Sequence, residues 1–384
     1  MQSLPPSGSA VIPPRFVRGV VILGANDETF APFYFCPMRI LWITPGFAAD
    51  EHDYNCIPPM QLLAKELLWR DVDLQIVALE YPFRSKPYRW HEATVFPCNG
   101  QNRLWLKPRT LWRAMRFCQA ITFRKFRTTD VSAIHSFWLG WASGVGEKVS
   151  ARRGIPHFTT LMGQDVLPEN RKFLRSLSPE RAARLVAVSE FQNSIFEKNT
   201  GLRAAYVIPW GVNGAEIPSV LPAERPLDVL GVGSLLSVKN WEKWLRVIAA
   251  TIHTFPNLRA ELIGGGPERA KLEQLAHKLG LSKNVRFVGD LPRSEVLARM
   301  RAAKILLHTA DFESFGYVLA EAAGAGCRVV STPVGIAPEL GAVAENVEDL
   351  AMLAMDGLQQ PVEEHSFAPF TMKNTTEAYL RLYF

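Results

Sequence analysis

The stretch "HTADFESFGYVLAEAAGAGCRVVSTPVG", residues 308–335, places a short polar loop before a helix with almost no polar face. From Tyr317 to Gly326 every side chain is apolar, aromatic or absent, except that of Glu321. A helix that is apolar all round is typical of a buried element. A carboxylate in such a helix is costly unless it is paired or hydrogen-bonded. Glu321, with Glu313 just before the helix, therefore marks either a buried ion pair that joins two domains or a ligand site.

Strands and helices alternate on both sides of this stretch. A polar linker with three prolines, residues 212–226, separates two alternating runs. Because strands that alternate with helices form parallel βαβ units, we predict two Rossmann-like domains with parallel sheets that face a central cleft. The expected strands of the first run are 38–47, 72–80, 131–137, 155–163, 184–189 and 204–211, and those of the second are 227–235, 258–268, 284–291, 303–310 and 327–335.

The bulk composition fits a globular protein of two domains. The chain has 384 residues, of which 48% are hydrophobic and 21% charged. No run reaches the ~18 apolar residues that a membrane span needs. The five cysteines are odd in number and form no CxxC pair, which predicts a cytoplasmic protein without disulfide bonds or zinc. The net charge of +6 permits an anionic ligand or membrane surface, and we expect no nucleic-acid partner.

Three short motifs are weak when each is read alone. "GVGSLL" (231–236) is half of a dinucleotide fingerprint, and "GGGPE" (264–268) is either an ordinary turn or a close approach to a ligand. Asp71 and Asp73 have the spacing of a DxD metal motif, but they straddle the start of a predicted strand, so we interpret them as a solvated turn. The loop before the apolar helix is more informative. The backbone N–H groups of Ser314, Phe315 and Gly316 would lie at a helix N-terminus, where phosphate groups bind.

Glu313 through Glu321 matches the Glu-x7-Glu signature of the retaining group 1 (family 4) glycosyltransferases, which have the GT-B fold. The resemblance covers residues 38–384 and includes "RILWITPGF" (39–47), "IPHFTTLMGQD" (155–165) and "VGSLLSVKN" (232–240). The order and spacing of these segments make the set specific. The resemblance implies transfer of a hexose-type sugar from a nucleotide-sugar donor to a glycan, lipid-linked or small-molecule acceptor, in polysaccharide or glycoconjugate synthesis. It also implies retention of anomeric configuration, no bound metal and no cofactor.

The resemblance also implies domain roles. Residues 38–218 would bind the acceptor and would be completed by a C-terminal helix at 366–384 that crosses back. Residues 219–365 would bind the nucleotide-sugar donor. Residues 1–37 are rich in Pro, Gly and Ser, and we interpret them as an extension that is disordered or precedes the natural start.

The roles of individual residues follow from the same resemblance. Glu313 would contact the donor sugar, Lys239 would neutralise the diphosphate, and His135 would line the cleft; these are the catalytic candidates. Glu321 would hold the ribose hydroxyls. The further substrate-binding candidates are Ser314, Phe315, Gly316, Gly46, Ser234, Gly265 and Asp165.

The sequence departs from the family pattern at three places. Ser234 stands where an arginine is usual, Met162 stands where a histidine precedes Gly163, and residues 57–59 replace a glycine pair. Two alternatives therefore stay open. One is a catalytically silent protein that binds a nucleotide sugar or a glycan, and the other is a different GT-B enzyme, such as a nucleotide-sugar epimerase.

A basic aromatic segment hints at a membrane surface. Residues 93–129 contain eight Lys or Arg residues, six aromatic residues and no acidic residue. The part at 110–127 has the pattern of a basic amphipathic helix on anionic lipid. The alternative is a core helix with solvated arginines. The first interpretation predicts a protein at the inner face of the membrane.

Overall fold

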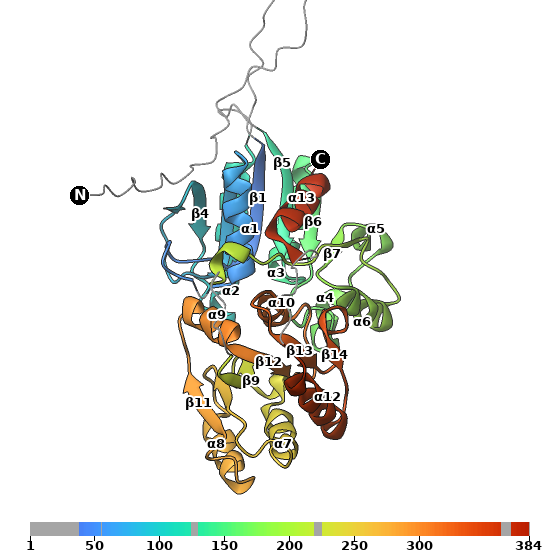
Figure 1. Ribbon diagram of the computed structural model, residues 1–384. Helices are drawn as coiled ribbons and strands as arrows, with labels where there is room; N and C mark the ends of the chain where they lie inside the picture. The colour runs from blue at the N-terminus through green and yellow to red at the C-terminus, as the bar shows by residue number, and fades with distance from the viewer. Residues whose placement is uncertain (1–37, 55, 124–129, 219–224, 362–369, 384) are drawn as a thin grey trace, which may run out of the picture. The chain divides into compact units, whose positions relative to one another are not determined.

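The computed structural model describes residues 38–54, 56–123, 130–218, 225–361 and 370–383 (Figure 1). The chain divides into one unit at 1–37 and a second at 38–384. Four predictions fall wholly or partly outside the described residues: the nature of the 1–37 extension, the boundaries at 218/219 and 365/366, and the basic segment at 124–127. Within the described part of the chain, no helix is long and apolar enough to cross a membrane.

The first half of the second unit forms an eight-stranded sheet with the order β3-β4-β2-β1-β5-β6-β7-β8. All neighbouring strands are parallel except β3 and β4. The strands are β1 (Arg39–Gly46), β2 (Asp73–Tyr81), β3 (Tyr88–Trp90), β4 (Ala93–Pro97), β5 (Val131–Phe137), β6 (His157–Thr160), β7 (Leu185–Ala187) and β8 (Tyr206–Val207).

Helices cover both faces of this sheet. Side chains of β1 alternate between the faces: Leu41 packs with α2 and α3, whereas Trp42 packs with α1 and the C-terminal helix α13. A strand buried on both faces is a nearly continuous apolar run, which β1 shows. The helices and 3₁₀ turns of this half are α1 (Pro58–Trp69), η1 (Leu104–Leu106), α2 (Lys107–Ile121), α3 (Trp141–Arg153), η3 (Pro168–Asn170), α4 (Arg171–Leu174), α5 (Pro179–Ala182), α6 (Glu190–Thr200) and η4 (Gly214–Glu216).

The second half forms a six-stranded parallel sheet with the order β11-β10-β9-β12-β13-β14. Its strands are β9 (Leu227–Val232), β10 (Ala260–Ile263), β11 (Val285–Gly289), β12 (Ala303–His308), β13 (Arg328–Ser331) and β14 (Ala342–Val343). Its helices and turns are η5 (Ser237–Lys239), α7 (Trp241–Thr251), α8 (Arg269–Lys278), α9 (Arg293–Ala302), α10 (Tyr317–Gly324), α11 (Ala337–Leu340) and α12 (Val347–Gln359). Because every strand is parallel, the loops that follow β9, β10, β11, β12 and β13 meet at one edge of the sheet.

The final helix, α13 (Met372–Tyr383), returns to the first sheet (Figure 1). Tyr379 is fully buried there, and its hydroxyl lies 2.9 Å from Thr160 Oγ1 at the end of β6. Thr375 Oγ1 donates to the carbonyl oxygen of Pro209 at 2.8 Å. The two parallel-sheet domains and the returning helix confirm the predicted fold class.

Candidate functional site

The loop between β12 and α10 carries Glu313, and a neighbouring loop positions Lys239 beside it. Several hydrogen bonds connect the two loops. The Asp311 N–H donates to the Val238 carbonyl oxygen at 2.9 Å, and the Asn240 side-chain amide donates to Asp311 Oδ1 at 2.9 Å. The Thr309 hydroxyl donates to the Asn240 carbonyl oxygen at 3.0 Å. The position of Lys239 is therefore fixed by the β12 loop rather than by its own strand.

Lys239, Glu313 and His308 form one ionic cluster at the edge of the second sheet. Lys239 Nζ pairs with Glu313 Oε1, and His308 Nε2 lies 3.2 Å from the same oxygen. Burial would raise the pKa of Glu313, but the neighbouring His308 ring and the charge of Lys239 outweigh it and lower that pKa to about 2. Glu313 is thus ionised at neutral pH and holds the ammonium group in place.

The helix α10 begins beside this cluster, as the sequence predicts. Gly316 is the N-cap residue, with a φ of 82° that favours glycine. The N–H groups of Ser314, Phe315 and Gly316 donate to no acceptor among the residues that the structure describes. Three such donors at a helix N-terminus form an anion-binding arrangement. The ammonium group of Lys239 lies close by, in its ion pair with Glu313.

Glu321 lies in α10, and its side chain is only 8% exposed. Its Oε1 pairs with Arg293 at the start of α9, whose Nε donates to Glu216 Oε2 at 2.8 Å. Burial raises the pKa of Glu321, while the charge of Arg293 acts against this rise. Arg293 Nη2 is buried without a hydrogen-bond partner among the described residues, and Glu321 Oε2 likewise accepts no hydrogen bond there. One carboxylate oxygen is therefore available to a ligand.

Ser234 and Gly265 lie in adjacent loops of the same edge. The Leu235 N–H donates to the Gly265 carbonyl oxygen at 2.8 Å, and the Trp241 indole donates to the Ser234 carbonyl oxygen at 2.9 Å. A side chain at Gly265 would meet the Asp290 carboxylate, which would have to move aside to make room for it. The Ser234 side chain is exposed and has no described partner.

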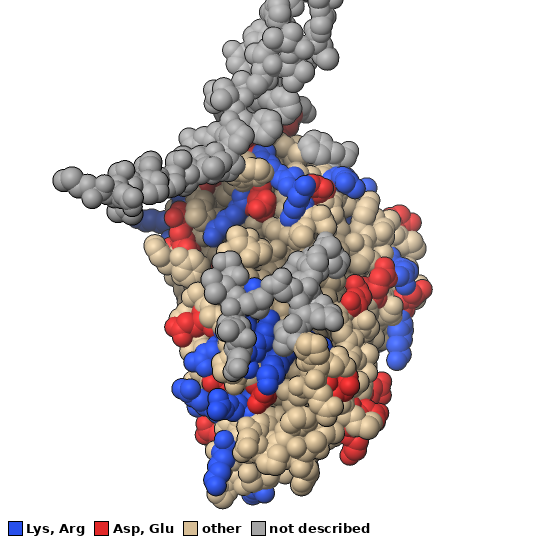
Figure 2. All heavy atoms as spheres, in the orientation of Figure 1, with Lys and Arg blue, Asp and Glu red and all other residues tan. Residues whose placement is uncertain are grey.

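The structure also joins this edge to the first domain. The Ser189 hydroxyl after β7 donates to the Ser314 carbonyl oxygen at 2.5 Å. The Tyr317 hydroxyl donates to the Gly211 carbonyl oxygen at 3.2 Å. Glu313, Lys239 and the start of α10 therefore lie next to loops of both sheets. In the view of Figure 2, Lys and Arg side chains gather over the elements around α9.

The candidates of the first domain do not join this group. His135 is fully buried, and its Nε2 lies 2.8 Å from Thr160 Oγ1, with the ring packed against Tyr379 and Tyr383 of α13. Burial lowers the pKa of His135 well below its usual value, so the ring is neutral. No ligand reaches it in this arrangement, and its surroundings are those of a core histidine in a strand rather than of a catalytic residue.

Asp165 and Gly46 also have structural surroundings. Asp165 Oδ2 accepts the N–H groups of Leu139 at 2.7 Å and Met162 at 2.8 Å, so this carboxylate joins two loops of the first sheet instead of facing a ligand. Gly46 ends β1 opposite Tyr81 in β2. Within the part of the chain that the structure describes, neither Asp165 nor Gly46 contacts the Glu313 cluster. Asp73, of the DxD spacing, pairs with Arg39, as a structural residue would.

The sequence reasoning missed three residues of the site: His308, Arg293 and Glu216. Two of them have a signal in the sequence. His308 is a polar residue at the end of an apolar strand, and Arg293 follows a predicted strand directly, at the edge where ligands bind. Glu216 lies in the linker, and only its contact with Arg293 connects it to the site.

Comparison with known proteins shows the family and the fold. A family model described as "Glycosyltransferase Family 4" matches residues 60–216, and one described as "Glycosyl transferases group 1" matches residues 214–347. The D-inositol 3-phosphate glycosyltransferase of Corynebacterium urealyticum is 36% identical over 50% of this chain and 49% of its own length. A phosphatidylinositol N-acetylglucosaminyltransferase component from Arabidopsis thaliana is 27% identical over 44% of this chain and 39% of its own length. The chain thus spans less than half the length of these curated relatives.

A solved structure supports the same fold. Anabaena HepE in complex with UDP and glucose has a TM-score of 0.63 and 18% identity, and the match covers 90% of this chain and 94% of the other. Two parallel-sheet domains with this returning helix define the GT-B architecture. Within it, the chain belongs to the group 1 (family 4) glycosyltransferases.

Proposed function

We propose that the protein transfers a hexose-type sugar from a nucleoside-diphosphate sugar to an acceptor hydroxyl, with retention of anomeric configuration. The observation that carries this proposal is the Lys239–Glu313 pair beside the unpaired N–H groups of Ser314, Phe315 and Gly316. Departure of a nucleoside diphosphate builds negative charge on the leaving oxygens. Preorganised donors aimed at developing charge are a large source of catalysis. These groups supply that charge stabilisation without a bound metal or cofactor.

The ribose would bind at Glu321. Its free Oε2 would accept one hydroxyl, while Arg293 holds the other oxygen and acts against the rise in the pKa of Glu321 that burial causes. Glu313 would contact the sugar, since it pairs with Lys239 and directly precedes Ser314, whose carbonyl oxygen accepts the Ser189 hydroxyl of the first domain. No described side chain at the site is a clear nucleophile toward the anomeric carbon. Attack by the acceptor on the face that the leaving group vacates therefore accounts for retention.

The acceptor is a glycan, a lipid-linked molecule or a small molecule, as in polysaccharide or glycoconjugate synthesis. The two relatives named above carry phosphatidylinositol and D-inositol 3-phosphate in their names. Both names describe phosphate-bearing molecules, which is compatible with a basic acceptor domain. We place the protein in the cytoplasm, with an anionic membrane surface as a further partner of α2.

A binding screen followed by a transfer assay tests this function. Thermal melting with UDP, GDP and ADP identifies the base, because a ligand that binds only the folded state stabilises it. The matching nucleotide sugar is then incubated with glycan and lipid acceptors, and NMR of the product reports the anomeric configuration. Product of inverted configuration would refute retention.

Two alternatives have their own outcomes in these assays. Binding of a nucleoside diphosphate without transfer to any acceptor would favour a silent binding protein, a possibility raised by Ser234 at the usual arginine position. Conversion of the free donor sugar into its epimer would favour an epimerase. Absence of binding to any nucleoside diphosphate would contradict the transferase, the epimerase and a silent protein that binds a nucleotide sugar, and would leave only a glycan-binding protein.

A further inference from the structure

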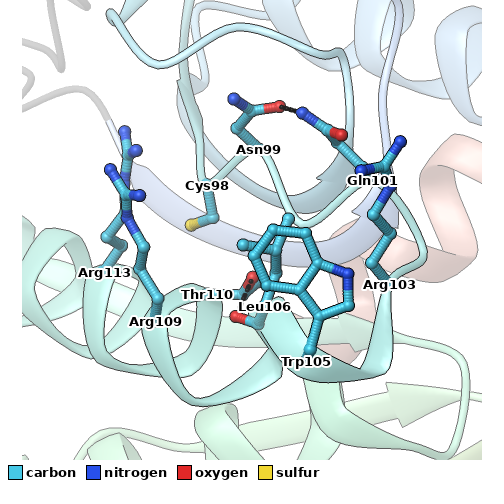
Figure 3. Close-up of a pocket in the computed structure, with 9 residues that line it drawn as sticks. All are labelled: Cys98, Asn99, Gln101, Arg103, Trp105, Leu106, Arg109, Thr110 and Arg113. Carbon is cyan, nitrogen blue, oxygen red and sulfur yellow. Dashed lines mark hydrogen bonds between the residues drawn. The ribbon is translucent and has the colours of Figure 1, made fainter.

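A pocket of about 270 Å³ lies between the loop that follows β4 and the first turns of α2, away from the Glu313 cluster. Figure 3 shows Arg109 and Arg113 side by side on one wall and Arg103 on the other. Asn99 and Gln101 lie along the rim, and the Gln101 amide donates to Asn99 Oδ1 at 3.1 Å. An anion inside this pocket would face guanidinium groups from two sides.

The positive charge of the pocket is not neutralised within the protein. Arg113 donates to the carbonyl oxygens of Ser85 at 2.7 Å and Pro97 at 3.2 Å, which hold it in place without removing its charge. Arg103 and Arg109 form no side-chain hydrogen bond or ion pair with the described residues. No acidic residue lines the pocket.

The carboxylate of Glu80, which lies near the pocket, does not neutralise the pocket's positive charge. Glu80 is paired with Lys107 and accepts the Asn102 N–H at 3.0 Å. Arg103 and Arg109 can each donate two parallel hydrogen bonds to a phosphate, and Arg113, although its guanidinium group is bonded to Ser85 and Pro97, adds its positive charge.

Large apolar side chains surround the opening. Leu104 is 84% exposed, Trp105 is 72% exposed and Trp112 is 58% exposed. Trp105 lines the pocket, and Arg116 stacks over Trp112 at 4.9 Å. The buried residues of α2, among them Thr110, Ala114 and Cys118, recur at helical spacing on the opposite face. Tryptophan and arginine on the outer face of an amphipathic helix are typical of a membrane interface.

We propose that this pocket binds the phosphate of an anionic lipid head group while Leu104 and Trp105 enter the lipid. The inference deepens the membrane part of the proposed function and rests on it, but it does not depend on the sugar chemistry. Sheet order places β4 five strand intervals from β7, which is roughly 24 Å at ~4.8 Å per interval. A phosphate on a small soluble acceptor would not span that distance to the Ser189 loop, so we assign the phosphate to a lipid.

The test compares two kinds of anionic vesicle with the full-length chain. Phosphatidylcholine vesicles carry either phosphatidic acid or oleic acid, adjusted to equal surface potential, and co-sedimentation measures binding. We expect about tenfold tighter binding to the phosphatidic acid vesicles, because only these present a phosphomonoester to the arginines. The variant Arg103→Ala/Arg109→Ala should lose this preference. The matched control Arg116→Ala/Arg152→Ala removes the same charge outside the pocket and should keep it.

Each other outcome overturns the inference. Equal binding of the wild type to both vesicles would show general charge attraction only. If the Arg116→Ala/Arg152→Ala control also lost the preference for phosphatidic acid vesicles, the pocket would not be the cause of that preference. If soluble glycerol 3-phosphate displaced the protein from phosphatidic acid vesicles as effectively as added phosphatidic acid vesicles do, the pocket would be assigned to a soluble ligand. Melting with UDP is the separate readout: both variants should bind UDP as the wild type does, so a failure of the sugar-transfer proposal would not be confused with a failure of this one.

Discussion

Arg293 and Glu321 form an ion pair that connects the first residue of α9 with the middle of α10. Arg293 also bonds to Glu216 in the linker, so one guanidinium group joins the candidate nucleotide site to the segment between the domains. The sequence leaves two interpretations of Glu321 open, a buried ion pair or a ligand carboxylate. The structure places Glu321 in an ion pair and still leaves one of its oxygens free.

Arg293→Met should destabilise the protein by about 3–5 kcal/mol, because it leaves Glu321 buried without a positive partner. The double variant Arg293→Met/Glu321→Gln should recover part of that loss, since it removes the unpaired charge. Urea unfolding of the single and double variants measures both. Additive losses in the double variant would mean that the two residues do not interact.

Glu321→Gln and Glu313→Gln should fail in different ways. Glu321→Gln should weaken binding of both the donor and the nucleoside diphosphate by about 1–3 kcal/mol, because it loses charged hydrogen bonds to the ribose. Glu313→Gln should bind the nucleoside diphosphate nearly normally and transfer sugar poorly, since its partner is absent from that product. Calorimetry and initial rates separate the two. If both variants only lost thermal stability, the two carboxylates would be structural.

Lys239→Ala should lower turnover severely and leave the fold intact, because the half-buried lysine pairs with Glu313 in the site and is not part of either hydrophobic core. Initial rates and circular dichroism measure the two effects. Ser234→Arg is the companion variant: its exposed position should let it reach the diphosphate and tighten nucleoside diphosphate binding. A near-normal rate for Lys239→Ala would remove the lysine from the mechanism.

Glu313 should stabilise the protein only above acidic pH. Its folded pKa of about 2 lies below the ordinary value of 4.5, so its contribution is present above about pH 4.5 and is lost as the pH falls toward 2. The wild type should therefore be more stable than Glu313→Gln at pH 7, by about 1–3 kcal/mol, and should lose this advantage near pH 2. Melting temperatures across this range measure the difference. A difference that stays constant with pH would contradict the lowered pKa.

Asp165 should have the opposite pH dependence. Burial raises its pKa from 3.8 to about 8, although the N–H groups of Met162 and Leu139 act in the other direction. The protonated side chain of Asp165 therefore makes its whole contribution to the stability of the folded protein below about pH 4. This contribution is lost as the pH rises to 8. Asp165→Asn keeps an acceptor oxygen and cannot ionise, so its stability relative to the wild type should increase over this interval. A parallel decline of both proteins in thermal melting would show that Asp165 is charged throughout.

The sequence specified the elements that depend on local pattern. The apolar run of β1, the start of α10 directly after Gly316 and the parallel pairing of all strands except β3 follow from side-chain periodicity, glycine backbone freedom and strand–helix alternation. Lys239 and Glu313 were predicted as members of one site from their positions in a resemblance, and the structure places them in contact. Their roles in catalysis stay predictions.

Only the tertiary structure decided which charged groups meet. His135 ends up beneath α13, against Tyr379 near the end of the chain, and no local pattern around a strand histidine reveals which helix will cover it. Arg293 reaches Glu321 because α9 and α10 pack side by side, and it reaches Glu216 because the linker passes the same edge. A sequence determines the periodicity of each element by itself, whereas ion pairs between distant segments depend on how the sheets and helices pack, and that packing is a property of the whole fold.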